Sequence, residues 1–354
     1  YQSGNPTVFN TKQVDFDGSD DYMIAKSTLG SFTGSVSCWV KRDSYGSDMY
    51  LYDARGLGNT GAGYVYLNSS TPSIASQSGG TMYVNGVSGA NITTNEWHHV
   101  VVTGQTLNIA TDIIFGSRFS LGAILNGQLS QVGLWNSTLT ADEVSSLYNH
   151  GLPVDLNTNQ AAYTSSSNLV GYWRMGSGTL DSYPIIYDQT NATETEIIVN
   201  GDFATDTDWT PSNWTYIGNG FKIIGASGVN SALYQIIPVV NGKTYSFSYT
   251  RNYISGGGTT NLYVQTNGSN FVTLGSYTST VVEEHTVTGT FVAGFTGNLY
   301  WNFYGIDTFT GTVTNISVKE IGGNPAIMSN TFAATAIENG SPYANIVQNG
   351  TFDT

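Results

Sequence analysis

Carboxylate pairs on one face of a strand could hydrolyse glycosidic bonds, because retaining hydrolysis uses two carboxyl groups about 5 Å apart. Alternate side chains of a strand share a face. Asp15 and Asp17 could therefore lie together, but they belong to an expected opening strand and turn. Glu283 and Glu284 are adjacent and face opposite sides, and no Glu-x-Asp-x-Glu run occurs. We expect no catalytic residues and a protein that is not an enzyme, with a glycoside hydrolase as the remote alternative.

The remaining reactive side chains also favour a structural interpretation. His98 and His99 are neighbours on an expected strand, so they point to opposite faces and cannot share a metal ion. The single cysteine, Cys38, lies in the apolar run VSCWV. We expect a buried thiol there.

Composition excludes two classes of partner. The chain has 354 residues, of which 25 are acidic and 11 basic, so its net charge is −14. Such a surface repels phosphate backbones and anionic membranes, and we expect no nucleic-acid partner. No run of 18 apolar residues occurs, so we expect no membrane insertion.

The elements that must position any site are short strands. Eight Asn-Gly pairs interrupt the sequence, and this dipeptide suits type I′ hairpin turns. Residues 298–304 (NLYWNFY) alternate in the manner of a strand with one buried face. One short helix is expected after Thr140, which forms a capping box with Glu143, and Gly151 is its expected stop. The fold class is all-β, with two β-sandwich domains of jelly-roll type in tandem.

Six motifs in residues 1–157 occur in the order of a known family. They are residues 14–22 (VDFDGSDDY), 32–41 (FTGSVSCWVK), 83–86 (YVNG), 96–103 (EWHHVVVT), 113–119 (IIFGSRF) and 126–135 (NGQLSQVGLW), and the capped helix follows them. This segment resembles the laminin-G-like or concanavalin A-like lectin/glucanase superfamily. The resemblance implies a lectin-like sandwich over 1–157.

A second module is expected over residues 197–321. Residues 200–203 (NGDF) with the tryptophans that follow, and residues 313–319 (VTNISVK), resemble the opening and closing motifs of carbohydrate-binding modules of the xylanase and cellulase type. Residues 158–196 are interpreted as a linker with an extra strand, Leu169 to Met175. That strand either closes the first sandwich or lies between the domains.

Residues 322–354 are interpreted as a linker and the start of a further repeat, because 349–352 (NGTF) repeats the motif at 200–203. Such module arrays resemble virion or fibre proteins of marine bacteriophages. The resemblance implies a place on a virion or an extracellular surface, contacts with other virion or fibre subunits, and a homo-oligomer, with a trimer favoured.

Two functions follow from these resemblances. The first is adhesion to glycans on a host surface, with aromatic rings stacking on sugars. The second is a purely structural fibre or decoration protein that binds no sugar. In the first case the candidate binding residues are Trp209, Trp214, Tyr216, Trp301 and Tyr304. The alternative for Trp209 and Trp214 is a place in the core.

Calcium is the one cofactor that the sequence suggests. Sandwiches of both families often hold a structural Ca²⁺ ion, which prefers six to eight oxygen ligands. In the second module the resemblance places Asp202 and Asn315 around such an ion. In the first module Asp17, Asp20 and Asp21 crowd one turn, where they either bind a cation or form a solvated acidic turn.

Overall fold

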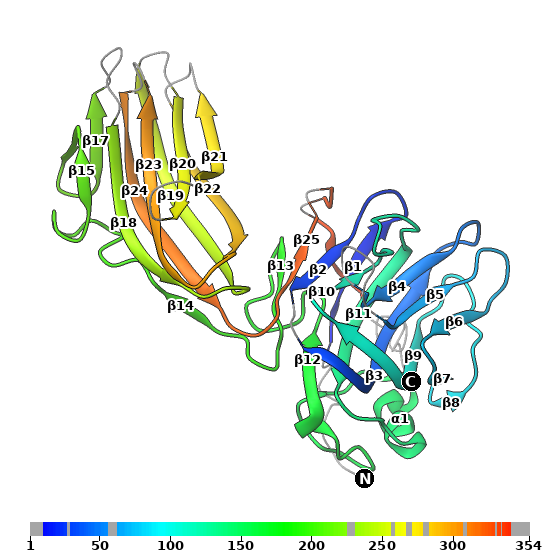
Figure 1. The fold of residues 1–354 in the computed structure, drawn as a ribbon. Coiled ribbons are helices and arrows are strands. Elements are labelled where there is room, and N and C mark those ends of the chain that lie inside the picture. Colours follow the sequence, from blue (N-terminus) through cyan, green and yellow to red (C-terminus); the bar gives the residue numbers. More distant parts are fainter. Residues whose placement is uncertain are drawn as a thin grey trace, which may run out of the picture. The chain divides into compact units, whose positions relative to one another are not determined.

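The structure, a computed structural model, divides the chain into two compact units. Unit 1 comprises residues 1–192 and the chain from 323 onward, and unit 2 comprises residues 193–322. Each unit consists of two antiparallel sheets (Figure 1). The all-β prediction is therefore confirmed. The structure describes residues 10–26, 29–55, 62–224, 231–255, 259–266, 271–278, 283–306, 310–329, 331–333 and 335–340.

The two sheets of unit 1 enclose one apolar core. The first sheet contains, in spatial order, β26 (Ile337–Asn339), β1 (Lys12–Asp17), β11 (Asn126–Trp135), β3 (Gly30–Arg42), β9 (His98–Ile109), β7 (Thr81–Val84) and β8 (Val87–Ser88), and β12 (Leu169–Trp173) also pairs with β11. The second sheet contains β13 (Ile185–Ile186), β25 (Ala326–Met328), β2 (Met23–Lys26), β10 (Asp112–Phe115), β4 (Met49–Asp53), β5 (Tyr64–Leu67) and β6 (Ile74–Gln77).

The first sheet of unit 1 is covered on both faces, which explains the continuous apolar run in β9. Val100 and Val102 face the core of the sandwich. Val101 between them faces a second apolar cluster, formed with helix α1 (Ala141–Tyr148). A strand buried on both sides needs apolar residues at successive positions rather than at alternate ones.

The expected helix start is confirmed. The Thr140 hydroxyl accepts a hydrogen bond from Glu143 N (3.2 Å), and the Glu143 carboxylate accepts one from Thr140 N (2.9 Å). The helix ends at Tyr148, before the expected stop at Gly151. Asn149 is the C-cap in a left-handed conformation (φ 43°), and the short 3₁₀ helix η1 (Asn149–Gly151) follows.

The interpretation of residues 158–196 as a linker is wrong for its greater part. Residues up to 192 belong to unit 1. Tyr163 is fully buried in the second apolar cluster, and its hydroxyl accepts a hydrogen bond from Trp135 Nε1 (2.9 Å). After the 3₁₀ helix η2 (Ser166–Asn168), strand β12 pairs with β11, with Trp173 opposite Val132. The strand from Leu169 therefore closes the first sandwich, which is one of the two alternatives that the sequence left open.

The interpretation of residues 322–354 as a linker is also wrong where the structure describes them. Strand β25 pairs with β2 and β13, and β26 pairs with β1. The chain after residue 322 packs back on unit 1 because the apolar side chains of Ala326 and Met328 are buried in the core of that unit. Unit 2 thus lies between two segments of unit 1 in the sequence, and the two domains are not in tandem. The repeated motif at 349–352 lies outside the described residues.

Unit 2 is the second sandwich, and its core is rich in aromatic side chains. Its first sheet contains β16 (Trp214–Tyr216), β17 (Phe221–Ile224), β24 (Thr310–Ile321), β19 (Thr244–Ser255) and β22 (Glu283–Val292), and β14 (Glu194–Glu196) also pairs with β24. Its second sheet contains β15 (Thr210–Ser212), β18 (Ser231–Val239), β23 (Gly297–Ile306), β20 (Thr259–Thr266) and β21 (Phe271–Thr278).

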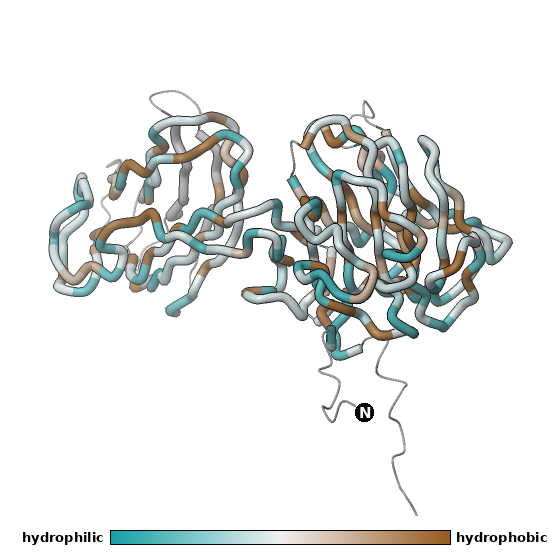
Figure 2. Tube along the Cα trace, turned by 90° about the horizontal axis from the view of Figure 1, so that it is seen from below, coloured by the Kyte–Doolittle hydropathy of each residue, from teal (hydrophilic) through white to brown (hydrophobic). Residues whose placement is uncertain are grey.

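Apolar stretches recur along the strands of both units and do not gather in one long segment (Figure 2). Among the described residues, no helix has the length and apolar character needed to cross a membrane.

Candidate functional site

The three tryptophans expected to bind sugar rings are buried instead. Trp209 and Trp214 are each 5% exposed and Trp301 is fully buried, and all three belong to the core of unit 2. Trp209 Nε1 donates a hydrogen bond to Asn200 O (3.1 Å), which fixes the opening motif to the core. The prediction of a tryptophan platform is wrong, because these large apolar surfaces fill the space between the two sheets.

The two tyrosines of the expected site differ in their roles. The Tyr216 hydroxyl donates toward the carbonyl oxygens of Phe203 and Gly218, each at 3.0 Å, and its ring packs on Phe221. Tyr216 therefore supports the backbone of the opening motif. Tyr304 is half-buried on β23, one residue beyond the core side chain of Phe303. Tyr304 is the expected residue that lies on an outer face.

An outward row of side chains on β18 and β23 forms the candidate site. Trp301 and Phe303 point into the core, so Tyr300, Asn302 and Tyr304 point outward. Tyr234 of β18 lies opposite Asn302 in the ladder, and its ring centroid is 5.6 Å from that of Tyr300. We call Tyr234, Tyr300, Asn302 and Tyr304 the tyrosine row.

Sequence reasoning missed three members of the tyrosine row, although the signal was present. In residues 298–304 the alternation assigns Trp301 to one face and its two neighbours to the other. Once Trp301 is assigned to the core, Tyr300 and Asn302 must face outward. Tyr234 follows from the ladder register, which the sequence does not contain.

The Asn302 side chain gives the row a polar centre. It is 7% exposed, and its Oδ1 atom lacks a hydrogen-bond partner. A buried acceptor without a donor costs about 1–3 kcal/mol. A ligand hydroxyl that donates to this oxygen would remove the cost.

The sheet that carries the tyrosine row is uncharged. None of its five strands contains an aspartate, glutamate, lysine or arginine. Ile236 on β18, whose side chain is 46% exposed, adds apolar surface beside the row. In a chain with a net charge of −14, a whole sheet without charge favours a neutral ligand over an ionic one.

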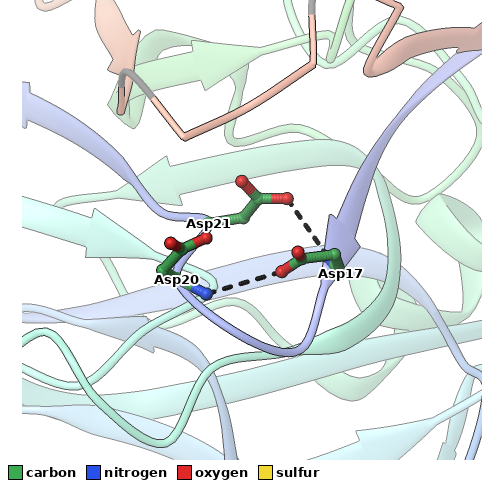
Figure 3. Close-up of side chains that lie close together, drawn as sticks. All are labelled: Asp17, Asp20 and Asp21. Carbon is green, nitrogen blue, oxygen red and sulfur yellow. Dashed lines mark hydrogen bonds between the residues drawn. The ribbon is translucent and has the colours of Figure 1, made fainter.

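The acidic turn of unit 1 is the candidate cation site (Figure 3). One carboxylate oxygen from each of Asp17, Asp20 and Asp21 lies within 4.8 Å of the others. Calcium–oxygen distances are about 2.3–2.6 Å, so three oxygens at this spacing can contact one ion. Thr331 donates a hydrogen bond to Asp20 O (2.9 Å), so the returning chain packs on the same turn.

Two of the carboxylate oxygens in the turn accept hydrogen bonds from backbone N–H groups. Asp17 Oδ1 accepts from Ser19 N (2.8 Å), and Asp21 Oδ2 accepts from Asp17 N (3.2 Å). Asp21 is 5% exposed, and its Oδ1 atom is buried without a partner. Burial raises the pKa of the Asp21 carboxyl, and the Asp17 carboxylate adds to the rise. The hydrogen bond from Asp17 N opposes this rise in the pKa of Asp21 without cancelling it, so negative charge is only partly compensated here.

The other expected metal ligands, Asp202 and Asn315, come from segments that do meet. Ile316 N donates to Gly201 O (2.8 Å), so the opening and closing motifs are neighbours. Both side chains are exposed, and Asp202 accepts a hydrogen bond from Ala204 N. Asn315 has a φ of 51° at a register shift of the β19–β24 ladder, so a β-bulge accounts for its presence. Among the described residues, no cluster of three acidic or metal-binding side chains forms here.

Many solved structures are similar to parts of the chain, and three of them illustrate the likeness. One described as CBM4 has 15% identity and a TM-score of 0.28, over 35% of this chain and 99% of that chain. The N-terminal cellulose-binding domain of β-1,4-glucanase C from Cellulomonas fimi has 17% identity and a TM-score of 0.26, over 39% and 98%. A SAP-like pentraxin from Limulus polyphemus has 14% identity and a TM-score of 0.29, over 40% and 82%.

None of the curated proteins compared with the chain matches it. Residues 16–111 match the family model described as the concanavalin A-like lectin/glucanases superfamily. All of these residues lie in unit 1. This part of unit 1 is therefore similar to the concanavalin A-like lectin/glucanases superfamily.

Proposed function

We propose that this chain is a non-catalytic glycan-binding protein and that unit 2 binds a neutral glycan on its tyrosine row. The observation that carries the proposal is the buried, unpartnered Oδ1 atom of Asn302 between half-buried tyrosine rings. Sugars present apolar ring faces and hydroxyl donors side by side. The row presents the complementary surfaces, aromatic rings and a buried acceptor.

The paired strands hold the tyrosine row in a fixed geometry, which favours binding of a ligand to this small surface. Tyr234 and Tyr300 lie on paired strands, with backbone hydrogen bonds that hold their relative position. A binding surface that is already ordered loses little conformational entropy when a ligand binds. The uncharged sheet also avoids the desolvation cost of burying ions beneath a neutral sugar.

The experiment is a titration of the whole chain, by calorimetry, with neutral beta-linked oligomers of glucose, xylose and galactose. We expect at least one oligomer to bind, and Tyr300→Ala or Asn302→Ala to weaken that binding about tenfold or more. The matched control is Tyr183→Ala, which removes a tyrosine of unit 1 that is 38% exposed. Equal affinity of the control and the two row variants would contradict the proposal.

The biological setting proposed for this function is a virion or another extracellular surface. A homo-oligomer, with a trimer favoured, would present several copies of the tyrosine row and add avidity. Sedimentation velocity of the whole chain tests this part, and a monomer at micromolar concentration would contradict it. The second candidate, a purely structural fibre or decoration protein, predicts that no glycan binds while the oligomer still forms.

We also propose that the acidic turn of unit 1 binds Ca²⁺. Three carboxylates within reach of one ion support this, together with the buried Asp21 oxygen that lacks a partner. Asp17, Asp20 and Asp21 would hold the ion, which would neutralise part of their mutual repulsion. The returning chain contacts this turn through Thr331, so an ion there would stabilise the packing of that segment on unit 1.

A further inference from the structure

Unit 1 carries a second aromatic surface, on the outer face of its second sheet. Tyr64 and Tyr66 alternate on β5 with Val65 and Leu67, which belong to the core, so both tyrosines face outward. Tyr50 of β4 lies opposite Tyr66 in the ladder. The ring centroid of Tyr50 is 5.3 Å from that of Tyr64 and 5.6 Å from that of Tyr66. Tyr64 and Tyr66 are half-buried, so part of each ring is accessible.

A buried carboxylate fixes an arginine beside these rings. Asp53 is fully buried and accepts hydrogen bonds from Arg55 Nε (2.9 Å) and from a second guanidinium nitrogen (2.5 Å). Asp53 also accepts from the backbone N of Phe119 (2.9 Å). The Arg55 guanidinium carbon lies 4.1 Å from the Tyr64 ring centroid and 4.3 Å from that of Phe119. Asp53 thus holds Arg55 and Phe119 in place and neutralises Arg55.

A second arginine next to this assembly has no carboxylate partner among the ion pairs of the described residues. Arg118 is exposed, and its Nε donates to the Ser120 hydroxyl (2.9 Å). Its guanidinium carbon lies 5.3 Å from the Phe119 ring centroid. With Asp53 and Arg55 paired, Arg118 leaves one positive charge at this surface.

We infer that this surface binds acidic glycans, with the carboxylate of a uronic acid paired to Arg118 and sugar rings stacked on Tyr64 and Tyr66. Arginine presents several N–H donors in one plane, which matches a carboxylate with two parallel hydrogen bonds. Contacts link Arg118 to Tyr64 through Phe119 and Arg55, so the half-buried tyrosine rings supply an apolar face for sugar rings further along the same glycan. The inference shares only the ligand class with the proposed function, since it concerns another unit, other residues and a charged sugar.

The two surfaces differ in charge and should therefore bind different glycans. The tyrosine row of unit 2 lies on an uncharged sheet, whereas the aromatic surface of unit 1 carries the exposed guanidinium of Arg118, which has no carboxylate partner among the ion pairs of the described residues. Because Arg118 is exposed, its attraction to a carboxylate is screened by salt. Binding to unit 1 should therefore weaken as ionic strength rises, and binding of a neutral glycan to unit 2 should not.

The test is a calorimetric titration of the whole chain with oligogalacturonate, with the neutral galactose oligomer of the same length, and with a sulfated galactose oligomer. We expect oligogalacturonate to bind better than the neutral oligomer. Arg118→Gln should weaken oligogalacturonate binding about tenfold, Arg118→Lys should retain part of it, and Tyr66→Ala should weaken it as well. The matched control is Lys222→Gln, which removes one positive charge from unit 2 and should change nothing.

Three results would overturn the inference. They are equal binding of the neutral oligomer, binding of the sulfated oligomer alone, and an unchanged affinity in Arg118→Gln. Since Arg118 is exposed, its variants should keep the melting temperature of the parent chain, which separates lost binding from lost folding. Asn302→Ala should leave oligogalacturonate binding intact, so failure of this inference and failure of the proposed function are distinguishable.

Discussion

His99 makes unit 1 sensitive to acid, and the structure fixes the sign of the effect. The imidazole is 1% exposed and packs against Trp39, with ring centroids 4.8 Å apart, and against Tyr148, at 6.2 Å, while these two rings also contact each other at 6.0 Å. Its Nε2 atom is 2.7 Å from the Ser37 hydroxyl, whereas Nδ1 is buried without a partner. Burial lowers the pKa of His99 to about 3.

The unfolded chain takes up a proton at this histidine near pH 6.5, and the folded chain does not. Between pH 7.5 and pH 5 the unfolded state therefore binds more protons, so the free energy of unfolding falls as pH falls. Integrating the difference over this range gives a loss of about 2 kcal/mol. The result barely changes if the folded pKa is one unit higher, because pH 5 is still above it. Burial also lowers the pKa of His98, which adds a loss of the same sign.

Hydrogen exchange read by mass spectrometry can measure this loss in unit 1 alone, through peptides from β3 and β9. We expect the His99 contribution to lower the free energy of opening by about 2 kcal/mol from pH 7.5 to pH 5. In His99→Phe the drop should be smaller by about that amount. Burial raises the pKa of Asp181 and Asp188, which opposes the drop, but this contribution is common to both proteins and cancels.

The control is His285→Gln, because this histidine is exposed on β22 of unit 2 and should not affect the exchange of unit 1. An equal pH dependence in the parent chain and in His99→Phe would refute the argument.

Three further predictions concern the stability of unit 1. Thr140→Ala removes the side-chain cap of helix α1 and should destabilise unit 1 by about 1 kcal/mol in urea denaturation, whereas Thr140→Ser should cost little. Replacing residues 193–322 with an Asn-Gly turn should leave unit 1 folded by circular dichroism, because Gly322 N donates to Thr193 O (2.9 Å) and the ends of unit 2 are adjacent. Calcium at one hundred times its dissociation constant from the acidic turn should raise the free energy of unfolding of unit 1 by about 2.7 kcal/mol. A melting temperature that is the same with calcium and with chelator, or a shift that persists in Asp20→Asn, would contradict the calcium site.

Local interactions were the features that the sequence predicted well. The capping box of Thr140 and Glu143 needs residues only three positions apart, and both of its hydrogen bonds form. The hairpin between β7 and β8 turns at Asn85 and Gly86, which have φ angles of 52° and 80°. Both motifs depend on backbone geometry within a few residues, so the sequence alone determines them.

Domain membership could not be predicted in the same way, because it depends on pairing between distant residues. Residues 158–192 and 323–340 are rich in polar side chains and turn residues, which favoured a linker. Their few apolar side chains nevertheless meet partners far away in the chain. Ile337 lies opposite Val14 in the ladder between β26 and β1, and Met328 lies opposite Met23. A short strand of this kind has no signal of its own until its partner strand is known.

The site prediction went wrong for a reason that applies to any sandwich with few charges. Tryptophan has the largest apolar surface, so its burial contributes most to the core, and Trp301 accordingly fills the space between the sheets. Tyrosine has a hydroxyl that must reach water or a partner, so tyrosines such as Tyr300 take the outward positions of the same strand. In such a strand a buried tryptophan identifies which face is inside. The residues on either side of it are then the candidates for binding, and here one of them, Asn302, also carries the unpartnered oxygen.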